Sequence, residues 1–176
     1  MTALQALLDD PTTAGAWNLV PARSSVRFKN KTFWGLVTVN GEFTEVSGDG
    51  QITAKGAVFG RLEIQASSLS TGIGKRDEHL LSPDFFDAKT HPEISVEVTG
   101  LQPTGENTAD LRATLTVRGT TRPLPLPVTV GRLGDGTIEL SARTSIDRTA
   151  LGVSGNMIGM MPATTMLLAQ LVFAKD

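Results

Sequence analysis

Hydrophobic and polar residues alternate along most of the chain after residue 17. Val26 and Phe28, for example, are each preceded by a polar residue. The same period of two recurs in four later segments, whose apolar positions are Leu62, Ile64 and Ala66; Ile94, Val96 and Val98; Leu111, Ala113, Leu115 and Val117; and Ile138, Leu140 and Ala142. Alternation of this kind is typical of β-strands that bury one face. The pattern therefore predicts an all-β protein.

Clusters of glycine and small polar residues separate the predicted strands. They occur at residues 47–50 (Ser-Gly-Asp-Gly), 104–107 (Thr-Gly-Glu-Asn) and 134–136 (Gly-Asp-Gly). Each cluster supplies residues that tolerate the positive φ angles of hairpin turns. Regularly spaced strands and turns favour an antiparallel sandwich or barrel. The length of 176 residues suits one domain, since domains typically run roughly 100 to 200 residues.

Two predicted strands depart from simple alternation. In residues 122–130, prolines at 123, 125 and 127 share one parity, so one side of this strand lacks three hydrogen-bond donors and should lie beside a gap or a free edge. A ligand could enter there, or a second chain could dock. In residues 164–174, the odd-numbered and the even-numbered positions are both mostly apolar, so both faces of that strand must be covered. Either strand could pair or pack with a second copy of the chain, so a homodimer is one possibility.

Two segments have helical rather than strand character. Leu4, Leu7 and Leu8 have helical spacing, which predicts either one short helix or a frayed extension over residues 1–15, ahead of a barrel domain at 16–176. The polar segment 74–91 can form short helical turns after Gly74 and after Ser82. We expect this segment to lie as an insert between strands.

Composition limits the possible partners. The formal charge is −2, and the 16 Lys and Arg residues are scattered, so we expect no nucleic-acid partner. No apolar run approaches the roughly 18 residues that a membrane span requires, so we expect no stable membrane insertion. The first residues lack the basic leader and apolar core of a secretory signal, which favours a cytoplasmic location.

The residues that usually carry out catalysis are scarce. The chain has no cysteine, no tyrosine and two histidines, and no serine lies in a Gly-x-Ser-x-Gly motif. His79 and His91 have no compact metal-ligand spacing, and no phosphate-binding loop is present. We therefore expect no enzyme activity, no metal and no cofactor. A barrel enzyme that uses Asp77 and His79 is a third option behind the two given below, and it would need a concave polar site.

Three stretches of this chain resemble a known family. Residues 74–96, 115–124 and 146–153, in that order along the chain, are similar to the motifs of the YceI-like polyisoprenoid-binding family. The resemblance implies a lipocalin-like antiparallel barrel of about eight strands, with a short helical insert around residues 74–91. It also implies binding of polyisoprenoids or other long amphiphiles in an internal cavity, without catalysis.

Our leading hypothesis is non-enzymatic binding, transport or storage of a long amphiphilic lipid inside the barrel. A polyisoprenoid, an isoprenoid quinone or a fatty-acid-like molecule would fit, because each buried methylene contributes roughly 0.8 kcal/mol. The predicted ligand contacts are Phe28, Trp34, Phe43, Ile64, Phe85, Phe86, Val96, Leu115, Met157, Met160, Met161, Met166 and Leu168, with Arg76, His79, Arg148 and Asn156 as candidates to select the head group.

The alternative is a solidly filled barrel that acts as a protein-interaction or dimerisation module without a small-molecule ligand. Inward-pointing Phe28, Trp34 and Phe43 would favour the filled barrel. A continuous internal channel would favour the lipid carrier.

Overall fold

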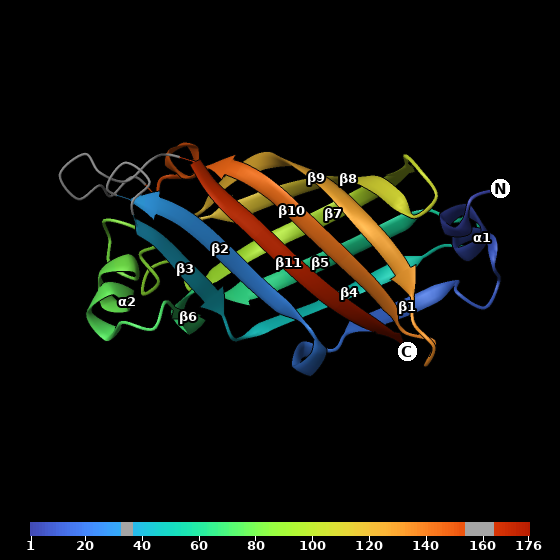
Figure 1. Ribbon diagram of the computed structural model, residues 1–176, viewed down its shortest axis with the longest axis horizontal. Helices are drawn as coiled ribbons and strands as arrows, with labels where there is room; N and C mark the ends of the chain where they lie inside the picture. The colour runs from blue at the N-terminus through green and yellow to red at the C-terminus, as the bar shows by residue number, and fades with distance from the viewer. Residues whose placement is uncertain (33–36, 154–163) are drawn as a thin grey trace.

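The computed structural model describes residues 1–32, 37–153 and 164–176. Within them, one continuous antiparallel sheet closes into an elongated barrel, with a short helix near each end (Figure 1). The strands of the closed ring are β1 (Gly15–Leu19), β4 (Val46–Ile52), β5 (Val58–Gln65), β7 (Glu93–Pro103), β8 (Thr108–Val117), β9 (Thr120–Arg132), β10 (Ile138–Asp147) and β11 (Thr164–Lys175). The pattern left a sandwich or a barrel open, and the barrel of about eight antiparallel strands that the resemblance implied is confirmed.

The long last strand, β11, pairs with two different strands along one edge. Residues 173–175 pair with β1, which closes the ring, and residues 166–170 pair with β2 (Ser25–Thr32). The turn η1 (Pro21–Arg23) connects β1 to β2. Two further strands, β3 (Val37–Phe43) and β6 (Leu69–Ser70), extend the sheet beyond β2. The barrel wall is therefore made by partly different strands at its two ends.

The final strand needs cover on both faces, as its sequence predicted. Leu171 faces the interior, and Val172, on the opposite face, is only 3% exposed. The η1 turn lies against this part of β11, where the Val20 amide donates to the Val172 carbonyl. Further along the outer face, Leu168 lies between Arg27 of β2 and Arg143 of β10. A turn and long neighbouring side chains therefore provide the cover.

The prolines of β9 lie beside a gap in the wall. β9 pairs with β8 through residues 120–129, but with β10 only through residues 128–132. The Val130 amide donates to Asn107, on the β8 side, so residues of the other parity, including the three prolines, face β10. Thr144 donates a hydrogen bond across the gap to the Pro125 carbonyl at 2.9 Å. The predicted gap is confirmed, and we call it the seam.

Two predictions for local structure were wrong. Residues 47–50 lie inside β4 instead of forming a turn, and the actual turn spans 53–57, with Gly56 at φ 80°. Gly48 is needed there for close approach, since a Cβ on it would come within 2.8 Å of the Arg61 carbonyl. After Ser82 the chain forms hydrogen-bonded turns and no helix. The amides of Phe85 and Asp87 both donate to the Ser82 carbonyl, and that of Ala88 donates to the Leu81 carbonyl, a pattern that does not continue as a helix.

The two predicted helical segments each contain one short helix. α1 (Ala3–Asp9) begins with a capping box in which Thr2 and Gln5 exchange hydrogen bonds, so the amphipathic helix is confirmed over the frayed extension. α2 (Gly74–Leu80) lies at the opposite end of the barrel (Figure 1). We refer to the two ends of the barrel as the α1 end and the α2 end.

Candidate functional site

The barrel encloses an apolar cavity of about 250 Å³. Its lining runs from Leu4 and Leu7 of α1 at one end to Leu80 and Phe85 at the other. The lining includes inward-facing residues of nearly every strand, and neighbouring clusters of buried core residues lie at both ends. A small volume spread over the length of the barrel suits a narrow, extended ligand. It also weighs against the solidly filled barrel.

Small side chains leave the middle of the cavity open. Ala142 of β10 and Ala169 of β11 lie directly opposite each other in the register, and both line the cavity. The wall is also thin between β4 and β5, where Gly50 lies opposite Gly60. The cavity lining there reaches the exposed side chain of Phe59, which is 46% accessible.

The α1 end of the cavity is lined by large apolar side chains. Trp17 is 4% exposed, and its indole nitrogen donates to the Thr13 carbonyl at 2.8 Å. This bond satisfies the one polar atom of the ring, so the ring itself can face apolar surroundings. The neighbours of Trp17 in this part of the core are Leu4, Leu7, Ile52, Leu111, Val130 and Ile138.

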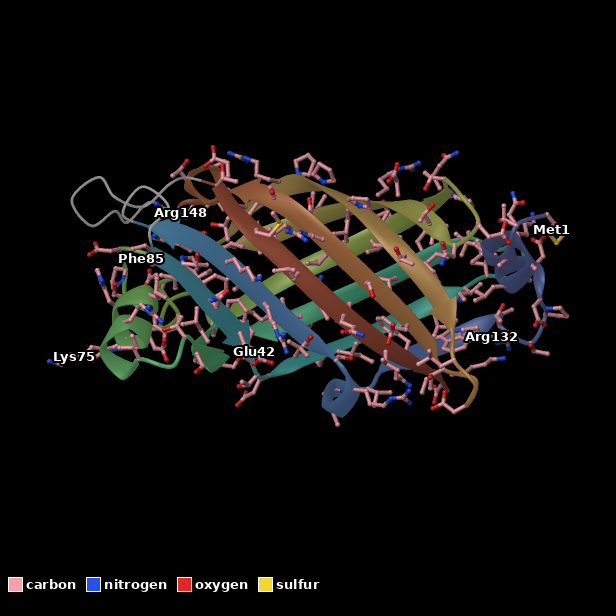
Figure 2. The ribbon with its side chains drawn as sticks, in the orientation of Figure 1. Met1, Glu42, Lys75, Phe85, Arg132 and Arg148 are labelled. Atoms are coloured by element: carbon pink, nitrogen blue, oxygen red, sulfur yellow. The ribbon has the colours of Figure 1, made fainter. Side chains whose placement is uncertain are left out.

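Buried polar residues of the lining gather at the α2 end. They are Asn30 near the end of β2, Arg148 after β10 and Thr165 at the start of β11. Arg148 is 6% exposed, donates to the Val153 carbonyl at 2.6 Å and lies 6.0 Å from the centroid of the Phe85 ring. Burial lowers the pKa of the Arg148 guanidinium, because a desolvated cation is less stable. Figure 2 shows both side chains at this end.

Three phenylalanines form an aromatic cluster beside these polar groups. The ring centroids of Phe28 and Phe43 are 5.7 Å apart, and Phe86 lies 5.8 Å from Phe43 with its ring perpendicular. Such tilted and edge-on contacts are favourable between aromatic quadrupoles. Gly41 makes the arrangement possible, because a Cβ there would overlap the Phe28 ring at 2.1 Å. The cluster narrows the cavity at the α2 end without filling it.

Arg118 fixes the chain segment that covers the α2 end. Its Nη1 atom donates to the carbonyls of Pro83, Phe85 and Gly152 at 2.7–2.9 Å. Arg118 and Gly119 occupy a tight hairpin turn between β8 and β9, with φ angles of 52° and 73°. The turn geometry therefore directs this side chain across the end of the barrel. Sequence analysis missed this role, because backbone carbonyls as partners leave no sequence pattern.

Most of the predicted ligand contacts within the described residues line the cavity. Those that do are Phe28, Phe43, Ile64, Phe85, Phe86, Val96, Leu115 and Arg148, together with Leu168, which borders the cavity although it has the outward parity of β11. The cavity also has lining residues that the sequence analysis did not select, chiefly from α1, β10 and β11. Strand parity could have revealed Leu140, Ile146 and Leu167, because they share the parity of other inward-facing residues. Contact with a ligand stays a prediction for all of them.

Three predicted contacts lie outside the cavity lining. Arg76 donates to the Thr71 hydroxyl and carbonyl, both at 2.8 Å. The His79 Nε2 atom lies 3.7 Å from a carboxylate oxygen of Asp84, and the His79 ring is nearly perpendicular to that of Phe85. Met166 accepts a weak hydrogen bond from Ser145. The first two side chains stabilise the α2 segment, and Met166 is part of the outer surface of β11.

Trp34, Asn156, Met157, Met160 and Met161 lie outside the described residues. Asp77 accepts hydrogen bonds from the amide and hydroxyl of Thr71, while the nearest acid to His79 is Asp84, so these groups serve separate local contacts.

Among residues 1–32, 37–153 and 164–176, no three histidine or acidic side chains are grouped as a metal would require. In the same part of the chain, no helix has the length and apolar character needed to cross a membrane.

Comparison with known proteins places this architecture in a family. The model of the YceI-like domain matches residues 17–173. The chain belongs to the YceI-like family. Curated relatives include a UPF0312 protein of Pseudomonas savastanoi pv. phaseolicola, 38% identical over 68 residues that cover 39% of this chain and 35% of the relative. A UPF0312 protein of Azotobacter vinelandii is 31% identical over 64 residues, which cover 36% and 33%. The matches thus span about a third of these relatives.

Two solved structures of other proteins share the fold. BcnA of Burkholderia cenocepacia superposes with a TM-score of 0.81 at 24% identity, covering 88% of this chain and 98% of that one. A polyisoprenoid binding domain from Saccharophagus degradans, described as implicated in plant cell wall breakdown, superposes with a TM-score of 0.75 at 20% identity, covering 91% and 98%. At these identities, the similarity establishes the YceI-like barrel.

Proposed function

We propose that this protein binds a long-chain amphiphilic lipid in the barrel cavity, without catalysing a reaction on it. The observation that carries this proposal is the apolar cavity that runs between the two capped ends of the barrel. The structural similarity to the polyisoprenoid binding domain from Saccharophagus degradans supports the same class of ligand. Polyisoprenoids, isoprenoid quinones and fatty acids all have the required long apolar chain.

The distribution of polar groups supports one orientation of the ligand. The tail would lie among the apolar side chains of the α1 end, where each methylene removed from water contributes roughly 0.8 kcal/mol. The head group would lie at the α2 end, beside the buried guanidinium of Arg148. A carboxylate, phosphate or carbonyl oxygen would accept a charge-assisted hydrogen bond there. Binding of this kind needs no catalytic group, which agrees with the scarcity of such residues.

Native mass spectrometry of the purified protein, followed by denaturing extraction, tests the proposal. We expect a bound mass in a one-to-one ratio, released as a prenyl or acyl compound. Ala169→Trp, which places a large ring in the middle of the cavity, should weaken retention of that compound by at least about tenfold, since an overpacked site costs roughly 1–3 kcal/mol.

Gln170→Trp is the matched control, because residue 170 is the exposed neighbour on the outer face of the same strand. It should retain the bound compound, and both variants should unfold as cooperatively as the wild type. A protein that binds no lipid after incubation with prenyl alcohols, prenyl phosphates and fatty acids would contradict the proposed function.

A further inference from the structure

Helix α1 lies across one open end of the barrel and is fixed to several hairpin turns there. Its first amides, Ala3 and Leu4, donate to the side chain and the backbone carbonyl of Glu106, in the turn between β7 and β8, at 2.8 and 2.9 Å. Asp10, just after the helix, pairs with Arg132 at the end of β9 at 2.9 Å. The helix is therefore attached on more than one side of the opening.

Other contacts position the end of the helix. The Thr13 hydroxyl donates to the Leu7 carbonyl at 2.6 Å, and Thr13 is fully buried. The turn between β4 and β5 also lies close, since a Cβ on Gly56 would come within 3.3 Å of the Leu8 carbonyl. These contacts hold a helix of seven residues that would be unstable alone in water.

The side chains that α1 directs inward form the end wall of the cavity. Leu4 and Leu7 are 2% and 8% exposed, and with Leu8 they belong to the cavity lining. We call these three leucines the α1 cap. An apolar chain that extends from the α2 end along the barrel reaches this cap last.

The α1 cap lies outside the part of the chain that matches the family. The YceI-like domain model begins at residue 17, and α1 spans Ala3–Asp9. The β-barrel wall is thus the shared part, whereas the closure at this end comes from residues that the family model does not cover.

We propose that the α1 cap sets the longest lipid chain that the cavity accepts. This inference rests on the proposed function and specifies the chain length for the same site. Each methylene that enters the cavity should tighten binding by about fourfold, the equivalent of its transfer from water. Once the terminal carbon touches the cap, a longer chain must either displace the helix or leave carbon atoms in water. Affinity then stops increasing, and the chain length at that break measures the distance to the cap.

The test measures dissociation constants for a series of saturated fatty acids, which share one head group and differ in length. Wild-type affinity should increase with chain length and then level off. Leu7→Ala shortens the cap and should move the break to longer chains, so the first two-carbon extension beyond the wild-type break gains about fifteenfold. Leu7→Trp lengthens the cap and should move the break to shorter chains.

Asp9→Asn serves as the matched control, because Asp9 is an exposed residue of the same helix. It should keep the wild-type break. If Leu7→Ala instead releases the whole helix, the break should disappear, which also supports the proposal. A break at the same chain length in the wild type, Leu7→Ala and Leu7→Trp would overturn it while leaving lipid binding intact. A wild-type protein without any chain-length-dependent binding would contradict the proposed function itself.

Discussion

The two ends of the barrel are closed in different ways. The α1 end is closed by a short helix at the beginning of the chain, whose leucines contact an apolar part of the core. The α2 end is covered by a segment from the middle of the chain, fixed by Arg118 and lined with aromatic and buried polar residues. Apolar closure suits the end of a lipid tail, whereas a buried cation suits a head group.

The difference also concerns stability. Helix α1 can separate from the barrel by itself, because it has only seven residues and few contacts connect it to the strands. The α2 segment is connected to strands at both ends and packs against the larger core cluster. We therefore expect damage at the α2 end to affect the whole barrel and damage at the α1 end to remain local.

The largest expected effect comes from truncating Phe85, which is 2% exposed. Phe85→Ala should lower the free energy of unfolding by about 3–5 kcal/mol, because it leaves a cavity in the core. Leu4 is equally buried at 2%, but Leu4→Ala should cost less in global unfolding, since the helix can detach first. Chemical denaturation of both variants measures this comparison. Equal losses would show that the two ends unfold as one unit.

Removal of the Arg118 contacts should have the next largest effect. Arg118→Ala leaves the carbonyls of Pro83, Phe85 and Gly152 without this donor, and hydrogen bonds to charged groups contribute roughly 1.5–3 kcal/mol each when made. Because water can reach part of the site, we expect a total loss of about 2–3 kcal/mol.

Arg118→Lys is the matched control for that variant. It keeps a cation with several donors and should retain more stability than Arg118→Ala. In Arg118→Ala, amide hydrogen exchange should become faster chiefly in residues 82–90. If instead exchange increased only in α1, the assignment of Arg118 to the α2 end would be wrong.

The smallest effect concerns pH at the α1 end. Hydrogen bonds from Thr12 and Arg132 lower the pKa of Asp10 from 3.8 to about 2. Because the folded-state pKa is lowered, the stabilising contribution of Asp10 is present above the unfolded-state value of 3.8 and is lost as the pH falls toward 2. Asp10→Asn should therefore have a lower Tm than the wild type at pH 5 to 7, and the difference should disappear near pH 2. A constant difference across this range would mean that the charge of Asp10 contributes nothing.

Several features of the fold were readable in the sequence because they depend on local chemistry. Alternation gave the strands and their inward parity, since side chains on a strand point alternately to its two faces. The prolines at 123, 125 and 127 predicted the seam, because a missing N–H group removes a ladder hydrogen bond wherever the strand lies. The helical spacing of Leu4, Leu7 and Leu8 predicted α1 for the same kind of reason.

Other features followed only from the position of distant segments. Gly48 read as a turn residue, yet it lies within β4, where the Arg61 carbonyl approaches too closely for a side chain. Arg76 and His79 were candidates for the head group, but the fold directs them to Thr71 and Asp84. Polar residues have many possible partners, and sequence spacing alone does not select among them.

The sequence by itself thus determined antiparallel strands, a seam beside the prolines of β9 and an amphipathic segment ahead of the sheet, because the period of apolar residues and the loss of amide donors act locally. The barrel itself was predicted by the family resemblance. Only the tertiary structure decided that α1 forms an end wall of the cavity, that Arg118 holds the opposite end, and that Arg148 is buried beside Phe85. Those arrangements join residues separated by long stretches of chain, so they exist only after the sheet has closed.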